Sequence, residues 1–234
     1  MLRYLLSLFL LKLCLASVLP QESISEYPDC DCTGRFVKPD RSAYYTYICG
    51  DKRLGPRVLP RKLPLGAFVD SYDRFGGLTP NEFLKKWYNT TKNGWNYPNH
   101  EGFQLDEGGR PMNASMTLTV GMLVDRFGDA GGRYLSPASA PFSQRALNPE
   151  NLDTPQSFPE FPNNYHVYRV MKQITVIAGP IRPWFSQPGL GTQFFLGDKV
   201  YVRDYVRNGS LMPLDPASLV KNGPGCGFER QDLK

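Results

Sequence analysis

The chain has 234 residues, of which 41% are hydrophobic and 21% charged, and its formal net charge is +5. This length suits one globular domain with a substantial core. Glycine and proline number 22 and 21, which favours a loop-rich fold, whereas the 13% of aromatic residues argues against disorder. The net charge is too small to indicate a nucleic-acid-binding protein.

Residues 1–16 have the parts of a secretory signal peptide. Arg3 supplies the positive start, an apolar run extends to Leu15, and cleavage is expected near Ala16. The run is interrupted by Lys12 and is too short to span a bilayer. We therefore expect a secreted protein, extracellular or on the cell wall, without a transmembrane anchor. Removal of the two basic residues lowers the formal net charge to +3.

Residues 17–78 are expected to form an irregular N-terminal extension pinned by disulfides. Four cysteines follow the signal peptide: Cys30, Cys32, Cys49 and Cys226. An even number in a secreted chain predicts two disulfides. A bond between Cys30 and Cys32 would close a strained loop, so we expect Cys226 to pair with the N-terminal group. A zinc site is disfavoured because the spacings are unsuitable and no histidine lies nearby.

A helix is predicted over residues 79–91, TPNEFLKKWYNTT. Thr79 can cap its N-terminus, Pro80 suits the first turn, and Glu82 completes a capping box. Trp87 lies one turn after a phenylalanine on the same face, which predicts that this tryptophan packs in the core.

Two β-rich segments follow, at 117–128 and 165–179, and each is interpreted as a strand. In the second segment, successive side chains from Tyr165 to Val170 are expected to face opposite sides. The residues between the two segments are interpreted as a proline-rich loop, and residues 199–210 carry helical spacing. These elements predict an α+β fold with a mainly antiparallel two-sheet core and peripheral helices, alongside the disulfide-tied extension.

Sequons at Asn89, Asn113 and Asn208 match the consensus for N-glycosylation. One sequon can arise by chance, but three behind a signal peptide favour a glycosylated eukaryotic secreted protein. We therefore expect all three asparagines to be glycosylation sites.

The signatures of the common catalytic machineries are absent, including HExxH, GxSxG, GxGxxG and the P-loop. The segment DRFGDAGGRYLSP instead places Arg126 and Phe127 before a glycine turn, and Arg133 and Tyr134 after it. Arginine offers a planar fork to phosphate oxygens, glycines allow a ligand close to the backbone, and aromatic rings can stack on a base. The segment indicates a phosphorylated aromatic ligand, and an ion-paired surface arginine beside a hairpin is the alternative.

Three ordered segments carry a resemblance to a known family: DRFGDAGGRYLSPASAPFSQRALNP, YHVYRV and AGPIRPWFSQPGLGTQFFL. From about Leu118 to Leu214 they resemble successive motifs of the tuberculosis necrotizing toxin (TNT) domain family. The signal peptide, clustered cysteines and sequons are similar to the fungal secreted members, which are NADases of spore surfaces. The resemblance implies that residues 79–234 form an NAD glycohydrolase domain, which splits NAD⁺ and NADP⁺ into nicotinamide and an ADP-ribose product.

The resemblance also implies roles for particular residues. Arg126 matches the pyrophosphate-binding arginine, and Arg145 matches a second arginine that contacts substrate and is expected to take part in catalysis. Phe127 and Tyr134 match residues on the nicotinamide side. Gln193 matches the glutamine that activity requires.

The proline- and glycine-rich segment 178–197 is expected to form a stiff pocket wall, which Trp184 and Phe185 would complete. His166 matches a family histidine and is counted with the substrate-binding residues, although a buried structural role is the alternative. Arg133 is interpreted as structural.

Other interpretations remain open on the sequence alone. An ADP-ribosyltransferase has the same binding demands, but such enzymes present a glutamate where this chain has Gln193, which favours water as acceptor. Cyclisation of the product and a non-enzymatic surface module are further alternatives. No cofactor is expected, and the tail, with only Glu229 and Asp232, does not predict the calcium site of some relatives. The aromatic-rich extension leaves a homodimer open.

Overall fold

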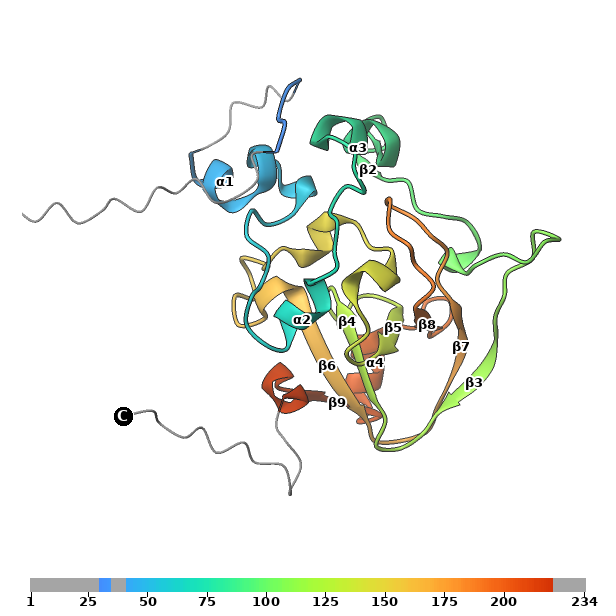
Figure 1. The fold of residues 1–234 in the computed structure, drawn as a ribbon. Helices are drawn as coiled ribbons and strands as arrows, with labels where there is room; N and C mark the ends of the chain where they lie inside the picture. Colours follow the sequence, from blue (N-terminus) through green and yellow to red (C-terminus); the bar gives the residue numbers. More distant parts are fainter. Residues whose placement is uncertain (1–29, 35–40, 221–234) are drawn as a thin grey trace, which may run out of the picture.

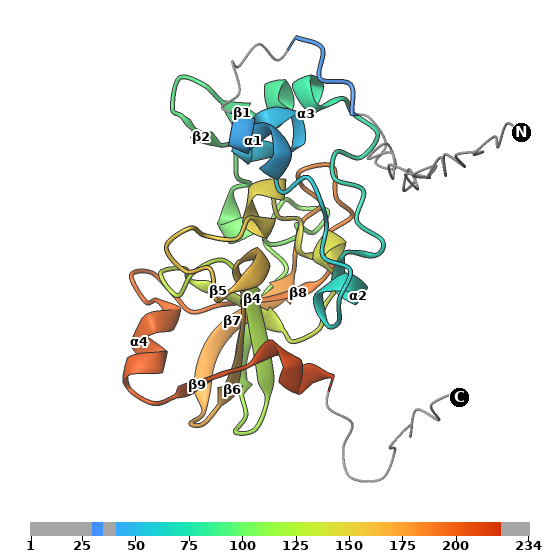
Figure 2. The same cartoon turned by 90° about the vertical axis from the view of Figure 1, so that its left-hand side faces the viewer.

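A computed structural model describes residues 30–34 and 41–220. Figures 1 and 2 show an antiparallel sheet at one end of the molecule and a helical region with a small hairpin at the other. The helices of the described residues are α1 (Arg41–Thr46), α2 (Leu65–Val69), α3 (Pro80–Trp87) and α4 (Val202–Arg207), with short 3₁₀ turns between elements. None of these helices has the length and apolar character needed to cross a membrane.

Two sheets account for the strands of the described residues. The small sheet pairs β1 (Tyr88–Asn89) with β2 (Gly94–Trp95). The large sheet has the order β3-β7-β8-β5-β4-β6-β9, and all its pairings are antiparallel. Its strands are β3 (Ala114–Leu118), β4 (Leu123–Phe127), β5 (Tyr134–Pro137), β6 (Tyr165–Val170), β7 (Ile174–Pro180), β8 (Thr192–Phe195) and β9 (Leu211–Leu214). The predicted α+β, mainly antiparallel fold is confirmed.

The prediction that segments 117–128 and 165–179 are single strands is wrong, because each segment contains two. The register runs on through the break, since Leu118 lies opposite Ile174 and Leu123 lies opposite Arg169. At the break, Gly121 has a φ of +90°, which side chains rarely adopt. The paired segments bend there, so β7 and β4 diverge and β8 and β5 fit between them.

The predicted alternation along β6 is confirmed by the two hydrophobic clusters that it joins. Tyr165 and Val167 pack with α2, whereas Tyr168 and Val170 pack with Val202 of α4. The two helices lie on opposite sides of the sheet (Figure 2). Burying both faces of a central strand gives the sheet a fixed position between two cores.

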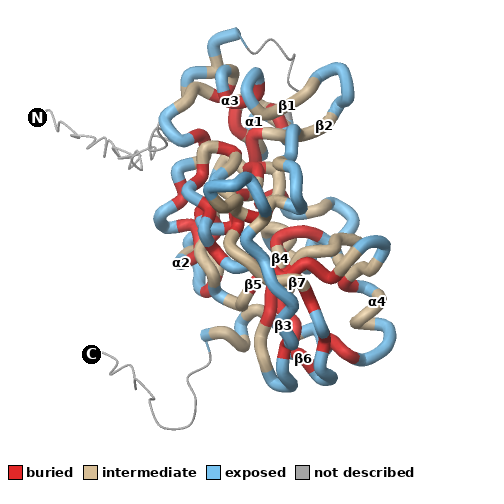
Figure 3. Tube along the Cα trace, turned by 90° about the vertical axis from the view of Figure 1, so that its right-hand side faces the viewer, coloured by how far each residue is buried: buried red, intermediate tan, exposed pale blue. Residues whose placement is uncertain are grey.

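The N-terminal extension contributes to a third cluster at the far end of the molecule (Figure 3). The predicted capping box is present, with Thr79 and Glu82 bonded to each other's backbone N–H. Phe83 is fully buried and Trp87 packs against the same cluster, as predicted. The extension forms α1 and α2 and packs on α3, where the sequence indicated irregular structure.

One disulfide lies within the described residues and joins Cys32 to Cys49, with their Cα atoms 5.6 Å apart. Cys30 has no disulfide partner within the described ranges and lines a cavity of about 910 Å³. Cys226 lies outside the described residues, so its pairing stays a prediction.

We expect Cys30 and Cys226 to form the second disulfide. Leu219 packs in a cluster with Leu59 and Val69, and both of these also line the cavity that contains Cys30. An extended chain of six residues spans about 20 Å, which allows the segment after Val220 to reach along this cavity. Peptide mapping of the unreduced secreted protein should recover a Cys30–Cys226 peptide. Recovery of both residues as free thiols would contradict the pairing.

A buried carboxyl group near the extension predicts a pH-dependent stability. Both carboxyl oxygens of Asp153 are buried without a hydrogen-bond partner in the described structure. Burial, followed by the charge of Glu150, raises the pKa of Asp153 from 3.8 to about 8, although Lys52 and Arg74 act in the opposite direction. The folded protein therefore holds a proton that the unfolded chain releases, so this group lowers stability as pH rises from about 4 to 8.

Asp153→Asn should abolish this loss. Between pH 5 and pH 8 the wild type should lose about 2–4 kcal/mol of unfolding free energy relative to the variant. Denaturant unfolding at both pH values measures the difference. Parallel stability of the two proteins across the window would show that Asp153 titrates normally.

Candidate active site

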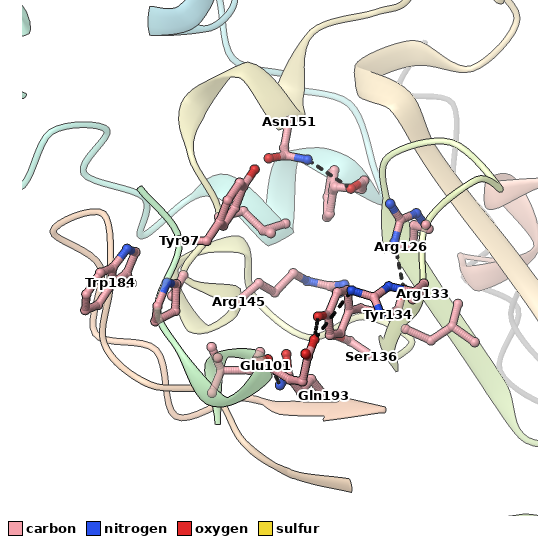
Figure 4. A pocket seen from close by; sticks show the side chains of 18 of the residues that line it. Tyr97, Glu101, Arg126, Arg133, Tyr134, Ser136, Arg145, Asn151, Trp184 and Gln193 are labelled. Carbon is pink, nitrogen blue, oxygen red and sulfur yellow. Dashed lines mark hydrogen bonds and ion pairs between the residues drawn. The ribbon is translucent and has the colours of Figure 1, made fainter. Parts of the chain in front are cut away.

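A cavity of about 700 Å³ opens beside the middle strands of the large sheet, among the ends of β4, β5 and β8 and two loops (Figure 4). The turn 97–102 forms one wall, and the loop that joins β7 to β8 forms another. Of the residues singled out from the sequence, the lining includes Arg126, Phe127, Arg133, Tyr134, Arg145, Trp184 and Gln193. The fold therefore brings together side chains that lie up to 67 positions apart in the sequence.

Gln193 lies on β8, opposite Gly179 of β7. Its side chain is buried against the turn 97–102, and its Nε2 donates a hydrogen bond to the Glu101 backbone carbonyl at 2.8 Å. This bond fixes which end of the amide faces the turn. The carbonyl oxygen Oε1 and one N–H then remain to interact with a ligand.

The loop at 181–191 is held by its own backbone and by its neighbours. Across its base, the Leu190 N–H donates to the Ile181 carbonyl and the Ile181 N–H donates to the Gly191 carbonyl. The Trp184 indole donates to the Asn96 carbonyl at 2.6 Å. Trp184 lines the cavity, as expected. The expectation for Phe185 is wrong: its ring is fully buried against the tryptophans of α3 and β2, which anchors the loop from behind.

Arg126 is a cavity-lining cation without a carboxylate partner in the described structure. Its Nη1 donates to the Tyr134 carbonyl at 2.9 Å, while its Nε is buried without a partner. No carboxylate among the described residues lies within ion-pair distance, and burial lowers the pKa of this guanidinium. Arg126 as a whole is half-buried, and a partly desolvated cation without a counter-charge is costly, so this part of the cavity favours an anion.

The glycines beside Arg126 make room for its side chain, whereas the sequence suggested that they allow a ligand close to the backbone. A Cβ on Gly132 would lie 2.0 Å from the Arg126 Nη2, and one on Gly128 would lie 2.7 Å from it. The guanidinium therefore lies flat against this turn. The glycines make room for the arginine, and the arginine is what faces the cavity.

Arg145 is almost fully neutralised. Its guanidinium makes a two-pronged ion pair with the buried Asp125, at 2.6 and 2.9 Å, and donates twice to the Ala140 carbonyl. Asp125 also accepts from the Tyr165 hydroxyl at 2.6 Å. Of the five N–H groups of an arginine, one on Nη1 is then left for a ligand. Its predicted contact with substrate stays a prediction that rests on this group.

The two aromatic residues expected on the nicotinamide side differ in exposure. Tyr134 stacks on Phe195 with ring centroids 5.3 Å apart, and its hydroxyl donates to the Glu101 carboxylate. Burial and this carboxylate raise the pKa of Tyr134. Phe127 is buried between Phe142 and Tyr165, so only part of its ring lines the cavity.

His166 is not part of the cavity lining. It lies on β6 directly opposite Arg126, and its Nε2 lies 3.1 Å from the Asn164 side-chain oxygen. Burial and the nearby Arg126 lower the pKa of His166, so the imidazole is neutral at pH 7. The structure thus places His166 beside Arg126 on the neighbouring strand and outside the cavity lining, so its contact with substrate stays a prediction.

Sequence reasoning missed one charged group of the site, Glu101, and misjudged another. Glu101 enters the cavity from a turn for which YPNHEG is the only local signal. Arg133, interpreted as structural, lines the cavity while pairing with Asp198 at 2.9 Å and with Glu101 at 3.6 Å. Both residues lie at the end of the cavity that holds Gln193 (Figure 4).

The remaining sequence-based site predictions concern surface asparagines and the tail. Asn113 and Asn208 are exposed and Asn89 is half-buried, and their glycosylation stays a prediction. Within residues 30–34 and 41–220, no three His, Cys, Asp or Glu side chains gather as a metal site would require. The tail with Glu229 and Asp232 lies outside the described residues.

Fold and cavity together define a small α+β domain with a cationic, aromatic-walled pocket at the ends of the middle strands of an antiparallel sheet. Residues 117–214 match the family model described as tuberculosis necrotizing toxin. Over 170 residues, the chain is 51% identical to the conidial surface nicotinamide adenine dinucleotide glycohydrolase nadA of Aspergillus fumigatus, covering 72% of this chain and 69% of that protein. The chain therefore belongs to the tuberculosis necrotizing toxin family, as the motifs indicated.

Solved structures were compared as well. The toxin in complex with its immunity factor IFT aligns over 58% of this chain and 71% of its own, with 21% identity and a TM-score of 0.46. Tse6 in complex with Tsi6 aligns over 44% of this chain and 72% of its own, with 20% identity and a TM-score of 0.30.

Proposed function

We propose that this protein is an NAD⁺ glycohydrolase, which hydrolyses the bond between nicotinamide and ribose to give nicotinamide and ADP-ribose. The observation that carries the proposal is the 51% identity to a glycohydrolase of this substrate, over 72% of this chain. The description of the same relative as a conidial surface protein supports an extracellular or surface location. NADP⁺ as a second substrate and a homodimer stay proposals.

The chemistry of the substrate explains how a pocket without a catalytic histidine can suffice. Nicotinamide in NAD⁺ is already cationic, so it leaves as a neutral molecule and needs no proton from an acid. The C1′–N bond breaks with its electron pair on nitrogen, and positive charge develops on the ribose. Water then adds to C1′ and loses a proton to solvent. The protein has to hold the substrate, orient the ribose and stabilise this charge.

Arg126 is proposed to bind the pyrophosphate. Its guanidinium lines the cavity, lacks a carboxylate partner within the described structure and is held in place by the Tyr134 carbonyl. Gln193 is proposed to hydrogen-bond the ribose or the attacking water through Oε1, because its Nε2 is already committed to Glu101. Tyr134, Phe127 and Trp184 are proposed to flank the nicotinamide side of the cavity.

The test uses the secreted, glycosylated protein with NAD⁺ as the only other solute of interest. Chromatography should show nicotinamide and ADP-ribose appearing in equal amounts without an added acceptor protein. Nicotinamide released only in the presence of an acceptor protein would favour an ADP-ribosyltransferase. NAD⁺ that stays intact in both conditions would favour a surface module without activity.

A further inference from the structure

The turn 97–102 supplies the cavity with a carboxylate from outside the segment 117–214 that matches the family model. His100, Glu101 and Gly102 have consecutive positive φ values of 57°, 53° and 78°. Two successive non-glycine residues in this left-handed region are unusual and are found where the surroundings demand them. Here the turn is held to the sheet by hydrogen bonds from Gln104 to Pro180 and from Arg182 to Gly102.

Glu101 is attached to the site through two different groups. Its backbone carbonyl accepts the hydrogen bond from Nε2 of Gln193 at 2.8 Å. Its side-chain carboxylate accepts from the Tyr134 hydroxyl and lies 3.6 Å from Nη2 of Arg133. The carboxylate therefore lies beside the glutamine on which the proposed reaction depends, as Figure 4 shows.

Glu101 also carries the solvent-exposed negative charge of the cavity. Among the described residues, the two carboxylates that line the cavity are Asp125 and Glu101. Asp125 is completely buried and neutralised by Arg145, whereas the Glu101 side chain is 39% exposed. A cavity that combines Arg126, which has no carboxylate partner, with an exposed carboxylate beside Gln193 can contact phosphates and a developing ribosyl cation at the same time.

We propose that Glu101 is a catalytic residue of the glycohydrolase. Its carboxylate accepts a hydrogen bond from a ribose hydroxyl next to the scissile bond and stabilises the positive charge that develops as nicotinamide leaves with the bonding electron pair. Its backbone carbonyl holds the Gln193 amide in position for the same step. This inference rests on the proposed function and adds a negatively charged group to a mechanism that otherwise has a neutral amide at C1′.

Glu101→Gln removes the charge but keeps the length of the side chain, its acceptor oxygen and the backbone carbonyl that holds Gln193. We expect kcat for NAD⁺ to fall by about 100-fold, which is typical of losing one preorganised electrostatic contact. KM should change by less than about threefold, because the contact strengthens mainly in the transition state. Glu107→Gln is the matched control, since Glu107 is exposed and outside the cavity lining, and it should retain wild-type kinetics.

Glu101→Asp separates a charge effect from a purely structural one. Aspartate keeps the charge but is one methylene shorter, so it should retain more kcat than glutamine. A structural glutamate would give the reverse order, because glutamine preserves the contacts with Tyr134 and Arg133 better. That reversed order, or Glu101→Gln at wild-type kcat, would overturn the proposal.

Further measurements distinguish a failure of the Glu101 role from misfolding of a variant and from a failure of the proposed function. If Glu101→Gln does not fold, the Asp and Asn variants give the same comparison of charged against neutral at equal length. If the wild-type protein releases no nicotinamide from NAD⁺, the proposed function fails and Glu101 loses its role with it. Wild-type turnover with an unaffected Glu101→Gln would reject Glu101 alone.

Discussion

Gln193→Ala is expected to lower kcat by about 10²–10³-fold, the usual cost of removing one positioned hydrogen-bonding group from a transition state. The Gln193 side chain lines the cavity and its amide is oriented by the Glu101 carbonyl. No other residue of β8 lines the cavity, so water would occupy the position of the amide in the variant. Water is not oriented as the amide is, so the transition state would be stabilised less. Steady-state kinetics with NAD⁺ measures the change, and thermal unfolding measures what the substitution does to the fold. The lost hydrogen bond should cost only about 1 kcal/mol of stability.

Gln187→Ala is the matched control. Gln187 is a buried glutamine of the loop that precedes β8, and its Nε2 also donates to a backbone carbonyl, that of Asp73. It lies outside the cavity lining, so its loss should lower stability while kcat falls far less than in Gln193→Ala. Equal losses of kcat and stability in the two variants would show that Gln193 serves the fold rather than the reaction.

The elements that the sequence predicted correctly are those with local signals. The capping box at Thr79 predicts the start of α3, and the helical spacing of Val202 and its neighbours predicts α4. Arg126, Tyr134 and Gln193 were placed by ordered motifs that the family model also spans. Such motifs carry information on three-dimensional proximity that no single segment of the chain contains.

What the sequence missed depends on contacts between distant segments. Glu101 enters the cavity because the turn before β3 is bonded to β7, and no pattern around it signals this. Phe185 was expected in the cavity wall, but the three-dimensional packing of α3 and β2 offers its ring a fully apolar site. The bend at Gly121 likewise exists because β8 and β5 enter between two halves of a paired ribbon. In each case contacts between segments far apart in the sequence decide where a locally ambiguous residue lies.

Gly132→Ala is expected to weaken substrate binding although the substitution removes no polar group. The added methyl would lie 2.0 Å from the Arg126 Nη2 and 2.1 Å from its Cζ. Because these atoms are the far end of a flexible side chain, the guanidinium should move away rather than the backbone, at a modest cost in stability of about 1–2 kcal/mol. Displacement of Arg126 should lower kcat/KM for NAD⁺ by about 100-fold, close to the effect of Arg126→Ala.

The double variant Gly132→Ala/Arg126→Ala makes this prediction specific. If the glycine acts only by making room for the arginine, the double variant should be no worse than Arg126→Ala alone, because the methyl then has nothing left to displace. Gly94→Ala on β2 is the control, since a Cβ there would meet no atom closer than 3.8 Å. Additive losses in the double variant would mean that the turn itself contacts substrate, as the sequence first suggested. Non-additive losses would assign Gly132 and Arg126 one shared task, which is to present a half-buried cation without a carboxylate partner to the phosphates of the dinucleotide.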